Sequence, residues 1–217
     1  QWFEFSDSLG TSAVIPPRLE NFTTAGGAKK LARYRWTWLK RALGDSSAND
    51  YRRLFTLVDA ANLTDPALYP ARLDAFADIE EWMRVFAVEN IVVNLDAWGY
   101  DIGKNMYAYK PPSGRWQLYM WDIDWVMLAS AQHGYSPTSP LMYRGPAVFG
   151  ESNRDPVVGR MYEHPTFQRA YWRAIADAVN GPLLPERVGS RLDATHAALV
   201  AQGVTRSSGS NLASPTA

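Results

Sequence analysis

The sequence predicts an α+β fold that is mainly helical, in which one β-hairpin carries the candidate functional residues. Apolar residues recur at helical spacing in several segments, most clearly over 78–95. Two short segments, 105–110 and 115–121, are rich in strand-forming residues and are joined by Pro-Pro-Ser-Gly, a typical turn sequence. Near the C-terminus, two helical patterns begin with Pro and are followed by Gly, as many helices are.

The first third of the chain is predicted to pass from irregular or β structure into helices. Residues 1–27 mix aromatic and polar side chains with a Pro pair and a Gly pair. Residues 28–43 place apolar side chains near helical spacing and precede a Gly, which predicts a helix. Asp50 is placed to cap a second helix that runs to about residue 61, and 65–66 (Asp-Pro) predicts the start of a short third helix.

The middle of the chain contains the clearest helix and the hairpin. Residues 78–95 line up one apolar stripe and carry three acidic residues in the first turn, where the helix dipole favours negative charge. A loop, 97–103, leads into the two predicted strands. Gly114 ends the turn between them, because it is free to adopt a positive φ.

The C-terminal part is predicted to contain a long loop, two helices and a tail. Residues 129–160 are rich in Gly, Pro and Ser and predict a loop of the kind that often shapes a site. Residues 165–179 and 185–202 predict helices. We expect residues 1–203 to form the domain and 204–217 to be a flexible tail or linker.

Composition excludes several classes of function. The chain has 217 residues with 22 basic and 22 acidic side chains, which argues against a nucleic-acid binder that depends on net positive charge. It contains no Cys, so disulfides and thiolate metal sites are excluded. No segment approaches the run of about 18 apolar residues that a membrane-spanning helix needs. The many Trp and Tyr residues predict a core of large rings, with a ring-lined groove as the alternative.

The candidate site consists of acidic and amide side chains around the hairpin. Asp122 and Asp124 are two apart in an extended segment, so their carboxylates point to the same side. Antiparallel pairing brings Asn105 to the same end of the hairpin as Asp122, and Asp96 lies a few residues before Asn105. Oxygen donors of this kind suit Mg²⁺ or Mn²⁺. The sequence therefore predicts one pocket that contains all four side chains.

The order of these residues matches the layout of phosphoryl-transfer sites in protein kinases. There, an Asp orients the acceptor hydroxyl, a nearby Asn follows, and an Asp after a hairpin helps the Asn to hold the metal. Asp96 is predicted to be the catalytic Asp because it follows a rigid helix. Asp101, in the middle of the loop, is the alternative.

Several motifs carry a family resemblance. Those around the site are Asn94-x-Asp96, Gly103-Lys104-Asn105-Met-Tyr-Ala-Tyr, Arg115-Trp116 and Trp121-Asp122-Ile-Asp124. Those elsewhere include Tyr34-Arg35-Trp36, Trp82-Met83-Arg84 and His164-Pro165-x-Phe167. With these motifs the chain resembles the CotH family of spore-coat-protein-H kinases, a group of atypical protein kinases.

The resemblance implies an atypical protein-kinase-like C-terminal lobe that uses ATP with Mg²⁺ or Mn²⁺ and phosphorylates Ser or Thr of secreted or coat proteins. It makes Asp96 the catalytic-loop Asp, Asn105 the loop Asn, and Asp122 and Asp124 the metal-binding pair. It also implies a secreted or cell-envelope location, and an N-terminal ATP-binding portion that is missing before residue 1. Lys104 is a candidate phosphate ligand, as are Lys29 and Lys30.

Two other functions remain open from the sequence. A non-catalytic surface or adhesion module could keep the same fold without binding ATP. A glycoside-acting enzyme could use two of the carboxylates across an aromatic groove, and it would need them about 5–9 Å apart.

Overall fold

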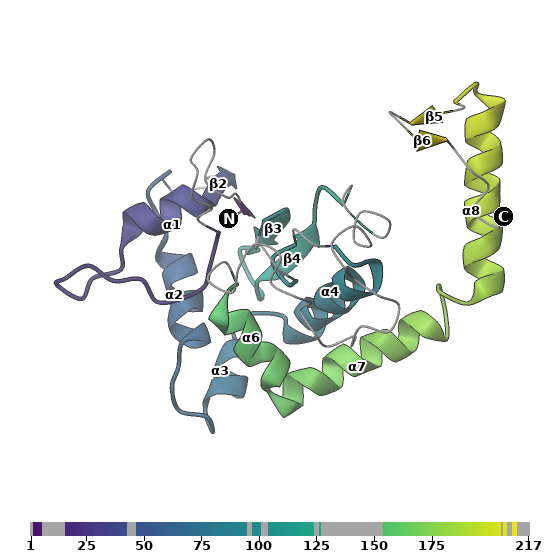
Figure 1. The fold of residues 1–217 in the computed structure, drawn as a ribbon. Coiled ribbons are helices and arrows are strands. Elements are labelled where there is room, and N and C mark those ends of the chain that lie inside the picture. Colours follow the sequence, from purple (N-terminus) through teal and green to yellow (C-terminus); the bar gives the residue numbers. More distant parts are fainter. Residues whose placement is uncertain are drawn as a thin grey trace. The chain divides into compact units, whose positions relative to one another are not determined.

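The computed structural model describes residues 2–5, 16–42, 47–94, 97–100, 104–123, 126, 154–204, 206–207 and 210–211. The chain divides into two compact units, Gln1–Ala174 and Ile175–Ala217, and the division falls within one helix. The fold is α+β, as predicted (Figure 1). The described candidate site residues all belong to the first unit, so the fold of that unit positions the site.

A four-stranded antiparallel sheet forms one layer of the first unit. Its strands are β1 (Trp2–Phe5), β2 (Trp38–Ala42), β3 (Met106–Tyr109) and β4 (Gln117–Met120), in the order β2-β1-β3-β4. The N-terminal strand β1 is therefore internal, with β2 on one side and β3 on the other. The predicted hairpin is confirmed as β3 and β4, with Gly114 at a φ of 111° in the connection.

The predicted helix over 28–43 is wrong in its second half. Helix α1 covers only Leu31–Thr37, and the chain then continues as strand β2. Two rings explain the change: Trp36 is 52% exposed, whereas Trp38 is fully buried and its ring lies 6.3 Å from that of Phe3. Pairing with β1 thus overrides the helical spacing of the segment, because the pairing buries Trp38.

The next three helices lie close to their predicted positions. They are α2 (Arg52–Ala61), α3 (Tyr69–Asp74) and α4 (Ile79–Val92). Helix α3 begins a few residues after the predicted start at 65–66, and Tyr51 occupies the N-cap of α2 in place of the predicted Asp50. Asp78 caps α4 through its side chain, and two acidic residues occupy the first turn of that helix. The helix ends three residues earlier than the predicted boundary at residue 95, because Val93 adopts the left-handed conformation that terminates helices.

Three helices follow residue 154: α6 (Pro156–Glu163), α7 (Pro165–Val179) and α8 (Pro185–Ala201). The last two confirm the predicted helices. Helix α6 begins inside the segment 129–160, which was predicted as a loop, and runs past its end. Asp155 Oδ1 accepts a hydrogen bond from Val157 N at 2.9 Å and so caps this helix. The second unit also contains a short hairpin, β5 (Arg206–Ser207) with β6 (Ser210–Asn211). The prediction of a flexible tail there stays a prediction.

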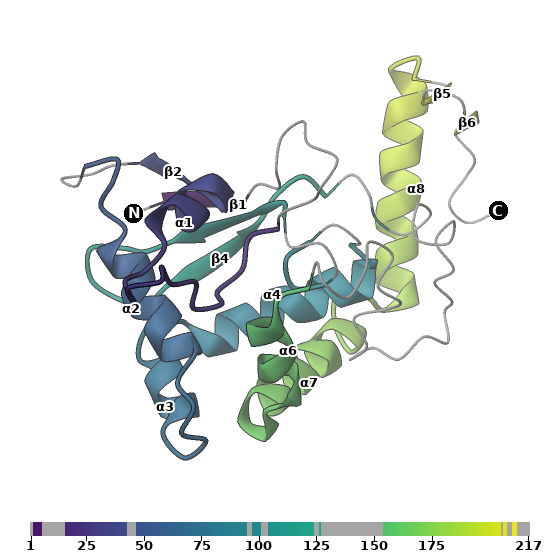
Figure 2. The same ribbon diagram turned by 60° about the vertical axis from the view of Figure 1, so that its left-hand side comes forward.

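Contacts between α4 and the hairpin hold the candidate site in place. Figure 2 shows α4 running beside β4. Trp116, just before β4, is the main link: its carbonyl accepts hydrogen bonds from Asp78 N and Trp82 Nε1, both at 2.9 Å, and its N–H donates to Phe76 O at 2.7 Å. The N-terminal end of α4 is thereby fixed to the hairpin.

Large rings fill the core beneath the sheet, as predicted. Trp98 is at the centre of this cluster, with ring centroids 5.6 Å from Trp82, 5.8 Å from Phe86 and 6.1 Å from Trp38. All four rings are almost fully buried. Among the helices of the described residues, none has the length and apolar character that crossing a membrane requires.

Candidate functional site

The open end of the hairpin brings two of the predicted site residues together. Met106 pairs with Met120, and one step further Trp121 N donates a hydrogen bond to Asn105 O at 3.2 Å. Asn105 and Asp122 therefore lie at the same end of the β3–β4 hairpin, as the predicted strand pairing requires. Asp122 is exposed and Asn105 is half-buried, so both side chains border solvent.

Both of these residues have an uncommon backbone conformation. Asn105 has a φ of 54° and Asp122 a φ of 53°, in the left-handed region. Among the described non-glycine residues, Val93 is the third with a positive φ, at 52°. Such conformations carry strain and are often found at functional sites. All three residues flank the candidate site, a feature that spacing in the sequence does not indicate.

The loop after α4 approaches the hairpin at this same end. Ala97 forms an isolated parallel bridge with Lys104, the residue before Asn105. The loop is shaped by Asn94, whose N–H donates to Glu89 O at 2.9 Å and whose carbonyl accepts from Ala97 N at 3.3 Å. Asp96 and the residue before it lie outside the described residues, which resume at Ala97, and Ala97 is bridged to Lys104.

Buried polar residues secure the loop from below. Tyr162 OH donates to Gly99 O at 2.8 Å and accepts from Asn90 Nδ2 at 3.0 Å, which joins α6, the loop and α4. Trp98 Nε1 donates to Asp155 Oδ2 at 3.2 Å, so the loop is also tied to the N-terminus of α6. These links make the position of the loop dependent on both helices.

Gly99 is required for the close packing between the loop and α4. A Cβ at this position would lie 2.2 Å from Phe86 Cδ1 and 2.6 Å from Glu89 Oε2. Glu89 is a fully buried carboxylate. Its nearness to the loop is a non-local contact, and no pattern in the sequence predicts it.

Asn94 is a further site residue that the sequence indicates only through its motif with Asp96. Its side chain is fully buried, and neither amide atom has a hydrogen-bond partner among the residues that the structure describes. A buried amide without a partner is uncommon in folded proteins and calls for a specific explanation. Its place, two residues before Asp96, makes it a candidate for orienting the loop.

The aromatic residues near the site divide into core and outward-facing rings. Trp98 and Tyr100 are buried, whereas Tyr119 and Trp121 are 44% and 53% exposed. Tyr107 and Trp121 meet edge to face with centroids 5.3 Å apart. The outer face of the hairpin therefore presents exposed rings next to Asn105 and Asp122.

The other predicted site residues are partly outside the described part of the chain and partly engaged in other contacts. Asp124 and the alternative Asp101 lie, like Asp96, outside the described residues. Within the described ranges, no group of three or more His, Asp or Glu side chains is placed to hold a metal ion. Lys29 pairs with Asp59 and donates to Asn21 Oδ1, so its predicted phosphate contact would compete with existing partners.

Comparison with protein families supports the resemblance seen in the motifs. The family model described as CotH kinase protein matches residues 20–211. The chain belongs to the CotH kinase family. A comparison with curated proteins gives no match. Membership in this family indicates a kinase-like role, and the matched region includes every candidate site residue.

Proposed function

We propose that this chain supplies the metal- and acceptor-binding part of an atypical protein kinase that transfers the γ-phosphate of ATP to Ser or Thr of a protein substrate. One observation supports this above all. Asn105 and Asp122 lie at the open end of the hairpin, and the loop that contains Asp96 reaches the same end through the bridge between Ala97 and Lys104. The family match is independent support.

The donor atoms at the hairpin end fit a divalent metal. The Asn105 amide oxygen and the Asp122 carboxylate are hard oxygen ligands of the type that Mg²⁺ and Mn²⁺ take. Asp122 is exposed, which leaves its carboxylate accessible. In this proposal Asp124, two residues further along the chain, provides a second carboxylate. Bound Mg-ATP or Mn-ATP would supply the phosphoryl group and the positive charge that offsets its negative oxygens.

The side chains of this protein would then position the acceptor and take up its proton. Asp96 accepts a hydrogen bond from the Ser or Thr hydroxyl and directs its oxygen at the γ-phosphorus. The bond from that oxygen to phosphorus forms as the bond from phosphorus to the β–γ bridging oxygen breaks, and ADP leaves. The hydroxyl proton passes to Asp96 and then to water. Lys104, next to Asn105, is assigned to the phosphate oxygens.

The acceptors in this proposal are secreted or spore-coat proteins, and the protein itself acts outside the cytoplasm or in the cell envelope. The family match supports this choice because the family takes its name from a coat protein. The rings of Tyr119 and Trp121 provide an exposed surface for substrate beside the metal ligands.

The assay for this proposal is phosphoryl transfer from ATP with a labelled γ-phosphate, in the full protein that contains this chain. Transfer to the protein itself and to casein is measured with Mg²⁺ and with Mn²⁺. Asp122→Asn is expected to lower the rate at least about 100-fold, since even residues behind a metal ligand affect activity by about 10–100-fold. Glu163→Gln is the control: Glu163 is an exposed carboxylate at the end of α6 and should leave the rate unchanged.

Two results would contradict the proposal. If the Asp122→Asn variant transferred the phosphoryl group at the wild-type rate, Asp122 would not be part of the site. Absence of both Mg-ATP binding and transfer in the wild-type protein would favour the non-catalytic surface module instead. Calorimetric titration with Mg-ATP separates loss of binding from loss of the chemical step.

A further inference from the structure

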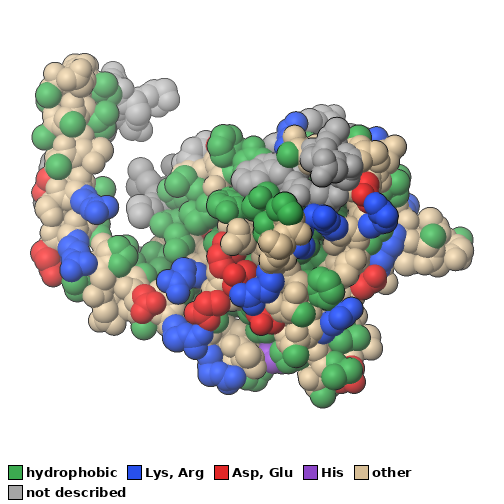
Figure 3. Space-filling model, turned by 180° about the vertical axis from the view of Figure 1, so that it is seen from behind, with side chains coloured by type: hydrophobic (Ala, Val, Ile, Leu, Met, Phe, Trp, Pro, Cys, Tyr) green, Lys and Arg blue, Asp and Glu red, His purple; other side chains and the backbone are tan. Residues whose placement is uncertain are grey.

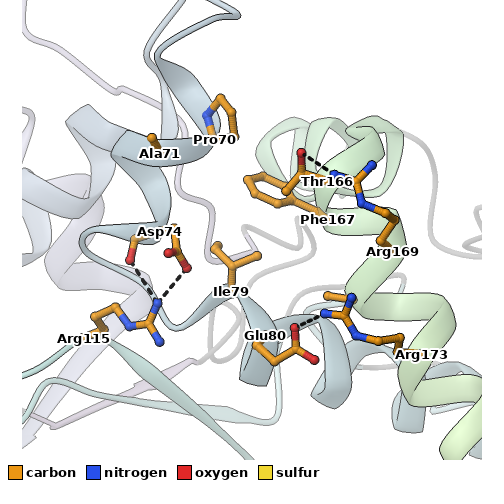
Figure 4. Close-up of a pocket in the computed structure, with 11 residues that line it drawn as sticks. Pro70, Ala71, Asp74, Ile79, Glu80, Arg115, Thr166, Phe167, Arg169 and Arg173 are labelled. Carbon is orange, nitrogen blue, oxygen red and sulfur yellow. Dashed lines mark hydrogen bonds and ion pairs between the residues drawn. The ribbon is translucent and has the colours of Figure 1, made fainter.

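A groove lies at the opposite end of the hairpin from the candidate site. Its volume is about 570 Å³, and all of its lining residues belong to the first unit. One wall comes from α3, the start of α4 and Arg115 next to the hairpin turn, and the other wall comes from α7 (Figure 4). A volume of this size is within the range of ligand-binding pockets, which is about 300–1,000 Å³.

The floor of the groove is apolar. Ile79 and Phe167 face each other across its centre, and Pro70 extends the same surface (Figure 4). Ala71 and Ala170 also line the groove and leave room because their side chains are small. An apolar side chain that binds in the groove is removed from water. Its burial favours binding by roughly 25 cal/mol per Å² of buried apolar surface.

Charged residues surround this floor, and all but one of the arginines that line it form ion pairs with described carboxylates. Arg115 contacts Asp74 at 2.7 Å and Asp78 at 2.9 Å, on one side of the groove. On the other side, Arg173 forms an ion pair with Glu80. Both carboxylates that line the groove, Asp74 and Glu80, therefore already have an arginine partner.

Arg169 is the exception. Its only hydrogen bond to a described residue goes from Nη2 to Thr166 Oγ1 at 3.3 Å, and no carboxylate of the described residues lies within ion-pair distance. Its guanidinium is exposed at the edge of the apolar floor. Figure 3 shows basic and acidic side chains close together beside apolar surface on the back of the molecule. The groove thus combines an apolar surface with an arginine that can accept a carboxylate partner.

We propose that this groove binds an acidic segment of the protein substrate, with an apolar side chain on the floor and an Asp or Glu carboxylate against Arg169. The proposal rests on the proposed kinase function, because it assigns the groove to the substrate of that activity. Charge complementarity favours this occupant: a carboxylate pairs with Arg169, whereas a basic segment would be repelled by it. An extended segment can supply both kinds of side chain, since alternate residues point in opposite directions.

The position of the groove relative to the candidate site sets a spacing in the substrate. Arg115 and Asp122 are seven residues apart on either side of β4, which at roughly 3.3 Å per residue is about 23 Å. An extended chain covers that distance in about six or seven residues. The acceptor Ser or Thr is therefore expected about that far, or further, from the acidic segment. Binding at both places would raise the effective concentration of the acceptor at the site.

The test is direct binding of labelled peptides, without nucleotide, measured by fluorescence anisotropy with the full protein. The probe is Gly-Leu-Glu-Leu-Glu-Leu-Gly, compared with matched peptides in which Gln or Lys replaces Glu. The Glu peptide is expected to bind at least about tenfold more tightly than the Gln peptide at low salt. Arg169→Glu should abolish that preference and favour the Lys peptide. Arg53→Glu, which changes an exposed arginine on α2, should have no effect.

Three outcomes would overturn the groove proposal: equal binding of the Glu and Gln peptides, no effect of Arg169→Glu, or equal competition by free N-acetylglutamate. The last would indicate a pocket for small acids. The Asp122→Asn variant separates this proposal from the kinase proposal, because it should bind the peptide normally. If the wild-type protein binds the peptide but transfers no phosphoryl group, the groove proposal stands and the kinase proposal fails. If it transfers the phosphoryl group but does not bind the peptide, the kinase proposal stands and the groove proposal fails.

Discussion

The two ends of the β3–β4 hairpin use positive φ angles in different ways. At the turn, the residue with a φ of 111° is Gly114, which has no side chain to be strained. At the open end, the residues with φ near 54° are Asn105 and Asp122. Asn and Asp tolerate this region better than other residues with side chains, yet Gly would be easier. We infer that the open end needs these side chains as well as this backbone.

The two ends also differ in how they are attached. At the turn end, Arg115 contacts Asp74 and Asp78, and the Trp116 N–H bonds to Phe76 O. At the open end, Trp121 and the next two residues are exposed. The turn end is thus fixed to α3 and α4, while the open end presents its side chains to solvent. Together with the Ala97–Lys104 bridge beside the open end, this attachment can keep the exposed side chains there in a constant position.

The largest effect is expected for Asn105→Gly. Gly accommodates the φ of 54° without strain, so the free energy of unfolding should stay the same or rise slightly. Phosphoryl transfer should fall about 100-fold or more, because the amide oxygen is lost from the proposed metal site. Transfer rates and urea denaturation of the same preparation measure both quantities.

The conservative variant Asn105→Asp sharpens this result. It keeps an oxygen ligand and a residue type that accepts the left-handed conformation, so activity should recover in part. If Asn105→Gly retained full activity, the site would need only the backbone conformation at this position and not the Asn105 side chain. The comparison with Gly114 would then lose its meaning.

The second prediction concerns the turn end. Gly114→Ala should destabilise the protein by about 1–3 kcal/mol, because a side chain at this φ is strained. In addition, the new Cβ would lie 3.3 Å from Pro111 Cγ. Activity per folded molecule should not change. Gly26→Ala is the matched control, since Gly26 has no positive φ and its nearest neighbour would be 3.9 Å away. Thermal unfolding and transfer assays distinguish the two effects.

The third prediction concerns Glu81, which links α4 to the middle of the hairpin. Both of its carboxylate oxygens accept from Leu118 N, at 3.1 and 3.3 Å. Burial raises its pKa to about 7, and the hydrogen bond from Leu118 opposes this only in part. The fold thus favours the protonated carboxyl. The resulting stabilisation is fully present below the unfolded-state pKa, about 4.5, and is lost as the pH rises through about 7.

Glu81→Gln removes this titration and keeps an acceptor for Leu118 N. The variant should differ little from the wild type at pH 4.5 and should melt at a higher temperature at pH 8. Thermal unfolding of both proteins across this range provides the measurement. A constant difference in melting temperature at every pH would show that Glu81 does not titrate in this range.

The parts of the fold that depend on local signals could be predicted from the sequence. Helix α7 begins and ends at the predicted residues because Pro165 starts it and its apolar spacing is regular. The hairpin follows from its strand composition and turn. Strand β2 could not be predicted in this way, because its residues are helical in spacing and become a strand only by pairing with β1, more than thirty residues earlier in the chain.

The candidate site was predictable in its composition and less so in its geometry. Spacing alone brings Asn105 and Asp122 to one end of the hairpin, and the structure places them there. The left-handed conformations of these residues leave no trace in the sequence. The packing of Gly99 against Glu89 was also hidden, because it joins a loop to a helix through tertiary contacts. The roles of Asp96 and Asp124 remain predictions.

The smallest effect is expected for Val93→Gly, at the end of α4. Val93 is an exception to the comparison above: it has a φ of 52° but a branched apolar side chain, which is strained there by about 1–2 kcal/mol. Glycine removes the strain and loses the packing of Val93 against Ala97 and Tyr100. The two terms nearly cancel, so the free energy of unfolding should change by only a few tenths of a kcal/mol.

Transfer activity decides what the strain at Val93 does. If the strain only terminates the helix, Val93→Gly should keep the wild-type rate, since Gly is the usual residue at this position of a helix end. If the rate falls while the stability in urea is unchanged, the rigid Val93 positions the loop that carries Asp96. That result would extend the inference drawn from Asn105 and Asp122 to the third residue with a positive φ.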